Sequence, residues 1–124
     1  MPQQLMSVHV GLDESIADAP RNATSTAYEA SRVIKKGPGF LYGLSGYSSR
    51  GSAQWIQIFD AATLPADQTL VPVITFTVAT VANFSLDFGL RGRFFESGIV
   101  VCNSSTGPTK TIGSADCWFD AQYS

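Results

Sequence analysis

The sequence predicts an all-β protein: a single β-sandwich or jelly-roll-like domain of about seven or eight short antiparallel strands with an extended N-terminal arm. From residue 27 onward, short apolar runs are separated by turns rich in glycine, proline and serine. No stretch of that region repeats its apolar residues at helical spacing over three turns. The chain has 124 residues, which suits one domain with one core.

Residues 1–26 are expected to form an arm or long loop, and residues 27–124 the β-sandwich domain. Most side chains of the first segment are polar or small, so they offer little surface to bury. Residues 7–10 alternate and predict a short strand, and residues 13–17 fit a short helical turn. The first residues lack the basic and apolar runs of a signal peptide, so synthesis in a cytosol is expected.

The strands of the domain are predicted from alternation and from the turns between them. Residues 71–79 alternate most clearly, with Ile74, Phe76 and Val78 on the inward face. Residues 53–61 are apolar on both faces, which predicts a central strand. The other strands are expected at residues 28–35, 40–47, 83–88 (phenylalanines and leucine inward), 95–103 and 115–123.

Composition and charge exclude two classes of partner. The net charge is −2, and no stripe of lysine and arginine could neutralise several phosphates at once, so direct nucleic-acid binding is not expected. No apolar run approaches the ~18–20 residues of a membrane span. Charged residues make up 15% of the chain, below the usual ~25%. Such a surface loses little solvation when a partner covers it, although a plain polar β-domain is an equal interpretation.

The two cysteines, Cys102 and Cys117, do not predict a metal site. Neither has a neighbour at CxxC spacing, and the single histidine, His9, is remote in sequence. A zinc site needs four clustered ligands, or three and a water. Because a cytosolic origin favours reduced thiols, two buried free thiols are expected, with a disulfide across a hairpin as the alternative. No cofactor is expected.

No grouping of reactive side chains predicts an enzyme. The carboxylates fall mostly in turns or on polar faces of strands, where solvation is the usual state. A serine triad would need His9, which lies in the expected arm, and no GxSxG motif is present. Residues 87–89 spell DFG, but the other kinase motifs are missing. The chain is therefore expected to act through contacts.

Arg91 and Arg93 are candidate partner-binding residues. They flank a glycine where a strand turns. Their forked guanidinium groups can donate paired hydrogen bonds to a carboxylate of a partner. The alternative interpretation is a solvated turn, or an ion pair with Asp87 inside the domain.

Several runs of the sequence resemble a family of small virion proteins of tailed bacteriophages. The similarity covers roughly residues 31–123 and excludes the arm. The family offers no catalytic motif to carry over, so the resemblance implies a phage structural protein. The runs are GFLYGLSGY (39–47), QWIQIFDA (54–61), NFSLDFG (83–89), GIVVCNSS (98–105) and ADCWF (115–119).

The expected place in the virion is the capsid surface. A compact sandwich with a polar arm suits a cement or decoration protein that binds and stabilises the shell, with the arm reaching across a neighbouring subunit. The expected partners are the major capsid protein or other virion proteins, and further copies of this chain. A trimer is the first expectation, for a site of local threefold symmetry. The chain would be made in the host bacterial cytoplasm and reside in the virion.

The alternative function is a tail, baseplate or fibre module that binds a host-surface glycan or another tail protein. Tyr42, Tyr47 and Trp118 are then candidate contacts, because aromatic faces can stack on sugar rings. An exposed Trp118 beside Asp120 and Gln122 would favour this alternative.

Overall fold

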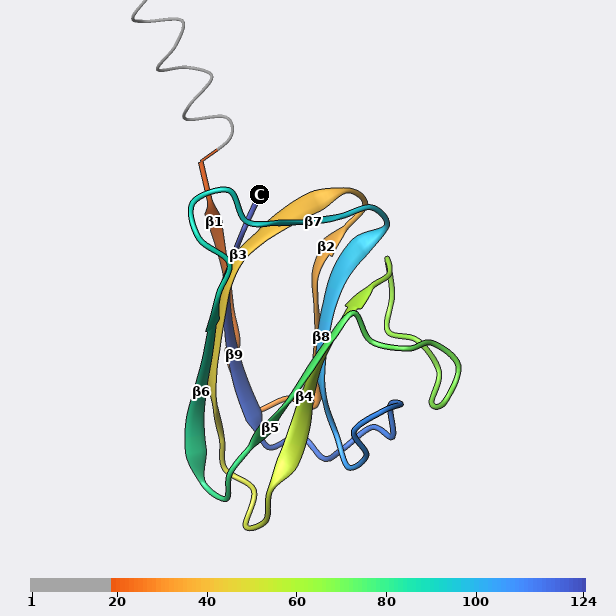
Figure 1. Cartoon of the computed structure of the whole chain (residues 1–124). Coiled ribbons are helices and arrows are strands. Elements are labelled where there is room, and N and C mark those ends of the chain that lie inside the picture. Colours follow the sequence, from red (N-terminus) through yellow and green to blue (C-terminus); the bar gives the residue numbers. More distant parts are fainter. Residues whose placement is uncertain (1–18) are drawn as a thin grey trace, which may run out of the picture.

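A computed structural model gives the structure of the chain and describes residues 19–124. The described residues form two antiparallel sheets packed face to face, with no helix among them (Figure 1). None of these residues therefore provides a helix able to cross a membrane. The strands are β1 (Arg21–Thr24), β2 (Ser31–Lys36), β3 (Gly39–Ser48), β4 (Gln54–Asp60), β5 (Ile74–Val78), β6 (Ala82–Asp87), β7 (Arg93–Phe95), β8 (Gly98–Ser104) and β9 (Cys117–Tyr123).

The order of the strands is that of a jelly roll. The first sheet runs β1-β9-β3-β6, and the second runs β2-β8-β4-β5. The pairs β1–β9, β2–β8, β3–β6 and β4–β5 are nested one inside the next, as if one long hairpin had been rolled up. The short β7 lies off this path and pairs with β3. The predicted all-β sandwich of antiparallel strands is confirmed.

The core lies between the two sheets and takes one alternating face from each. Leu41, Leu44 and Phe119 project from the first sheet, and Ile56 and Ile58 from the second; all five are at most 2% exposed. Each such side chain stabilises the fold by about 1.5–3 kcal/mol relative to leaving it exposed. Three further strand predictions are confirmed by this core: β4 is central, β5 packs through Ile74, Phe76 and Val78, and β6 packs through Phe84 and Leu86.

The sandwich begins within the segment expected to be an arm. The four residues of β1 pair with β9 at the edge of the first sheet. Ser25 continues the contact, since its N–H donates to the Phe119 carbonyl and its Oγ accepts from the Phe119 N–H, both at 2.8 Å. Residues 21–26 thus belong to the β-domain, because an edge strand buries only one face and tolerates polar residues. The strand expected at residues 7–10 and the helical turn at 13–17 lie outside the described residues.

The strand expected at residues 95–103 is found as β8, but Phe95 belongs to a separate short strand in the other sheet. β7 ends at Phe95 and β8 starts at Gly98. The corner between them is held by Asp60, whose carboxylate accepts from the N–H groups of Glu96, Ser97 and Gly98 at 3.1, 2.7 and 3.3 Å. Burial acts to raise the pKa of Asp60, but these donors and the nearby Arg93 outweigh it and lower that pKa.

Two loops cover the outer face of the second sheet. Phe59, Val100 and Cys102 point outward from this sheet and are nevertheless fully buried, with Ala61 and Leu64 packed against them. Beside them, the Gln57 amide donates to three carbonyls of the loop that joins β8 and β9. The outer face of the first sheet lacks such a cover among the described residues and displays partly or fully exposed side chains.

Candidate interaction surface

One end of the sandwich is closed by a flap of two strands with aromatic side chains on its outside. The first residues of β3 cross this end together with β7 (Figure 1). Alternation buries Leu41 and Phe95 completely beneath the flap and leaves Phe40 and Phe94 37% and 53% exposed above it. A register shift between Leu41 and Gly43, opposite β9, lets β3 bend into the flap.

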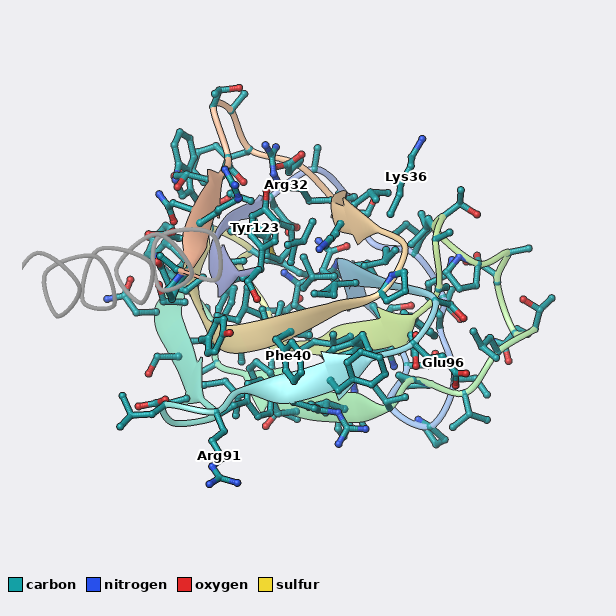
Figure 2. All side chains as sticks on the ribbon, turned by 90° about the horizontal axis from the view of Figure 1, so that it is seen from above. Arg32, Lys36, Phe40, Arg91, Glu96 and Tyr123 are labelled. Carbon is teal, nitrogen blue, oxygen red and sulfur yellow. The ribbon has the colours of Figure 1, made fainter. Side chains whose placement is uncertain are left out.

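The outer aromatics of the flap contact one another, and we call Phe40, Tyr42 and Phe94 the end cluster. The ring centroids of Phe40 and Phe94 are 5.2 Å apart and tilted by 55°. Those of Phe40 and Tyr42 are 6.4 Å apart and nearly parallel at 24°. The Tyr42 hydroxyl is fixed by a hydrogen bond of 3.1 Å with the Ser124 hydroxyl. Figure 2 looks down on this end and shows Phe40 facing the viewer.

Beside the end cluster lies a hollow of about 610 Å³, which we call the end pocket. Its charged lining side chains are two cations, Arg21 from the start of β1 and Lys35 from β2, and no carboxylate side chain lines it. A methyl group on Gly39 would lie 2.7 Å from the Lys35 side chain and 2.5 Å from the Ser124 carbonyl. The absence of a side chain at Gly39 therefore allows β3 to lie close to Lys35 and Ser124 at this wall of the pocket. The lining residues are Arg21, Lys35, Pro38, Gly39, Phe40, Tyr42, Phe94 and Ser124.

The structure places the predicted contact residues Arg91 and Arg93 outside this pocket. Both are exposed, and Figure 2 shows Arg91 pointing away from the body. Arg93 lies over the ring of Phe95, with 5.6 Å from its guanidinium carbon to the ring centroid. Within residues 19–124, neither arginine forms an ion pair with Asp87, which accepts instead from the Gly89 N–H at 2.7 Å.

The three predicted aromatic contacts are divided between the two ends of the first sheet. Tyr42 belongs to the end cluster, whereas Tyr47 lies opposite Trp118 across β3 and β9 at the far end. Tyr47 lies five residue steps beyond Tyr42 along β3, which is about 17 Å at the usual rise per residue. Trp118 is partly exposed and meets Tyr28 edge to face at 5.8 Å.

A second, shallower hollow of about 300 Å³ lies on the outer face of the first sheet. Asp120 and Gln122 line it and share that face of β9 with Trp118. It offers carboxylate, amide and hydroxyl groups to a ligand. The other lining residues are Gly43, Leu44, Ser45, Ser85, Leu86 and Asp87.

Chemistry at the cysteines is limited by their burial. Cys102 and Cys117 are both free and buried, as expected. Burial raises the pKa of each thiol to about 12, so neither forms the reactive thiolate at neutral pH. Among residues 19–124, no group of three or more histidine, cysteine or carboxylate side chains is arranged to hold a metal ion, and His9 lies outside that range.

Sequence reasoning missed Arg21, Lys35, Phe40 and Phe94 as surface residues. One signal was available: consecutive Phe94 and Phe95 in a strand must face opposite sides, so one of them has to leave the core. The end pocket itself could not be foreseen, because Arg21 and Ser124 meet only through the pairing of the first and last strands.

Fold and surface together define a jelly-roll domain that presents an aromatic, cationic end. No family model matches the chain, and no curated protein matches it significantly. Among solved structures, the chain is similar to two structures of the Tobacco streak virus coat protein. For the first, the sequence identity is 13% and the TM-score 0.41, over 84% of this chain and 86% of that chain. For the second, the coat protein dimer, the identity is 11% and the TM-score 0.42, over 86% of each chain.

A third similar structure is the virus-like particle of the extra small virus of the prawn Macrobrachium rosenbergii. The identity is 8% and the TM-score 0.36, over 84% of this chain and 77% of that chain. Superpositions this loose do not indicate a shared function.

Proposed function

We propose that the chain is a virion structural protein, and more narrowly a cement or decoration protein that binds the major capsid protein shell of a tailed bacteriophage. The observation that carries this proposal is the end cluster. Phe40 and Phe94 are exposed, the half-buried Tyr42 stacks on Phe40, and a cationic pocket lies next to all three. Aromatic and arginine side chains are enriched at protein–protein interfaces, and a contiguous exposed apolar patch marks such a contact.

The rest of the molecule fits the same role. The sandwich is compact, and its surface has few charges to strip of water when a neighbouring subunit covers it. On a symmetric shell, many copies that each bind weakly add up to firm attachment. A homo-oligomer, with a trimer as the first candidate, would place several end clusters at one site of local symmetry.

Paired replacement of two cluster residues tests the proposal. Shells lacking this protein would be incubated with wild type, with F40S/F94S, and with the control V71S/V81S, whose valines are 69% and 53% exposed in loops. We expect F40S/F94S to lower the apparent affinity by at least about 30-fold, the effect of losing one interface hot spot. The control should bind as wild type does. Equal binding of both variants, measured as copies per shell, would contradict the role of the cluster.

A second candidate function is glycan binding by a tail, baseplate or fibre module. It is favoured by the partly exposed Trp118, which lies opposite Tyr47 and on the same face as Asp120 and Gln122. Loss of binding to host cells in Trp118→Ala, with shell attachment unchanged, would support this function over the first.

A further inference from the structure

Two cationic side chains line the end pocket, and neither forms an ion pair with a carboxylate side chain among residues 19–124. They are Arg21 and Lys35, whereas the ion pairs of this region join other residues, Arg32 with Glu29 and Lys110 with Asp67. Aromatic rings form the remaining wall. The pocket therefore suits a ligand that carries carboxylates next to apolar side chains.

The segment before the described residues has this chemistry. Residues 1–18 contain three carboxylates and no lysine or arginine. The carboxylates, Asp13, Glu14 and Asp18, are interleaved with Leu12 and Ile16. Leu12 lies nine residues before the start of β1, so fully extended chain can carry it up to about 30 Å from Arg21. The segment is long enough to reach a neighbouring molecule.

The local sequence disfavours return of this segment into the pocket of its own chain. Arg21 both starts β1 and lines the pocket, so the tightest return, which would bring Asp18 into the pocket, has to reverse the chain within residues 18–21. That turn would place Pro20 at its third position, where the proline ring forces the preceding residue out of the helical conformation that a type I turn needs. A second molecule can deliver the same residues without such a turn.

We propose that residues 12–18 of one copy occupy the end pocket of a second copy. The carboxylates of the segment pair with Arg21 and Lys35, and its apolar side chains pack on Phe40 and Phe94. Repetition of this exchange around a symmetry axis gives a closed oligomer. The inference deepens the proposed function, because it makes the end cluster a contact between copies within the oligomer that binds the shell; F40S/F94S would then weaken shell binding by breaking that oligomer. It rests on the proposed function only for the role of the oligomer on a shell.

The test uses a synthetic peptide of residues 1–18 and the chain lacking those residues, so no particle is involved. The peptide should bind the shortened chain, measured by fluorescence anisotropy. Arg21→Glu or Lys35→Glu should weaken binding at least about tenfold, the loss of one charge-assisted hydrogen bond. The matched control is Arg50→Glu, which makes the same charge change in the turn between β3 and β4 at the opposite end. A peptide with D13K, E14K and D18K should recover binding to the R21E/K35E variant.

The mass of the intact chain in solution separates exchange between molecules from return within one molecule. Light scattering after size exclusion should show an oligomer for the intact chain and a monomer for the shortened chain. A monomeric intact chain, or equal peptide binding by the Arg21→Glu and Arg50→Glu variants, overturns the inference. Neither the peptide measurement nor the mass measurement involves a shell. A negative result in these two experiments therefore contradicts only this inference, and a negative result in the shell-binding assay contradicts only the proposed function.

Discussion

Lys110 shows how a buried charge can hold two loops onto a sheet. Its side chain is 3% exposed, and its ammonium contacts the carboxylate of Asp67, which is 42% exposed. The contact joins the loop after β4 to the loop after β8, over the outer face of the second sheet. Donation by Lys110 lowers the pKa of Asp67. Because the lysine is the buried partner, the two residues should respond differently to substitution.

Asp67→Asn should destabilise the protein measurably, because it leaves a buried ammonium without a counter-charge. Lys110→Met should cost less, since water can solvate the exposed Asp67. Urea unfolding at pH 7 measures both. Since the folded-state pKa of Asp67 lies below its ordinary value of 3.8, the wild-type advantage should be complete above that pH and should be lost as the pH falls below it. Equal costs for the two variants would contradict this assignment of the buried partner.

Cys102 and Cys117 should not react with thiol reagents in the folded protein. With a pKa of about 12, both thiols stay protonated at pH 8 and are shielded from reagents. We expect negligible reaction with a disulfide reagent at pH 8 and reaction of both thiols after unfolding in guanidinium. The unfolded thiols titrate near 9.0, so stability should fall as the pH rises above 9. Fast reaction of either thiol in the folded protein would contradict its burial.

Among the elements, β3 packs closely against its neighbours at Gly46, where no side chain can be accommodated. A methyl group on Gly46 would lie 2.0 Å from the Trp118 carbonyl and 2.4 Å from the Phe84 ring. Gly46→Ala should therefore destabilise the fold by about 1–3 kcal/mol or more, because it forces β3 and β9 apart. Gly51→Ala is the matched control, since nothing lies within 4 Å of its added methyl. Similar denaturation midpoints for the two variants would show that β3 can shift to accommodate a methyl group at residue 46.

Elements were predictable from the sequence where a strand buries one face along its whole length. β5, β6 and β9 have this alternation, and β4 carries apolar residues on both faces, as a central strand does. β1 and β7 have only four and three residues, too few for a period to emerge. The corner after Phe95 depends on Asp60, which is remote in sequence, so no local pattern could reveal it.

For the molecule as a whole, the first strand sets how far the chain can be shortened. Deleting residues 1–18 should leave a folded domain, because every strand among the described residues begins at Arg21 or later; the midpoint of thermal unfolding should fall only by what the contact between copies contributes. Deleting residues 1–24 removes β1 and uncovers the edge of β9, and should lower that midpoint by several degrees. Circular dichroism melts measure both. Equal midpoints for the two deletions would mean that β1 contributes nothing to the fold.

The candidate surface was less predictable than the fold, because it is assembled from distant parts of the chain. Tyr42 was identified from its residue type, but Arg21, Lys35 and Phe94 join it only once the jelly roll has closed. The spacing of Arg91 and Arg93 around a glycine predicts a paired contact with a partner, and the structure leaves both arginines at the surface, outside the pocket.

The position of β9 between β1 and β3 also governs when the protein can fold. During synthesis, the first sheet lacks an inner strand until residues 117–123 have left the ribosome. Every earlier nascent chain holds β1 with no neighbour and β3 with one side unpaired, both open to strands of other chains. We therefore expect this domain to complete its fold only once β9 has left the ribosome, and to need chaperones to protect its open strand edges until then.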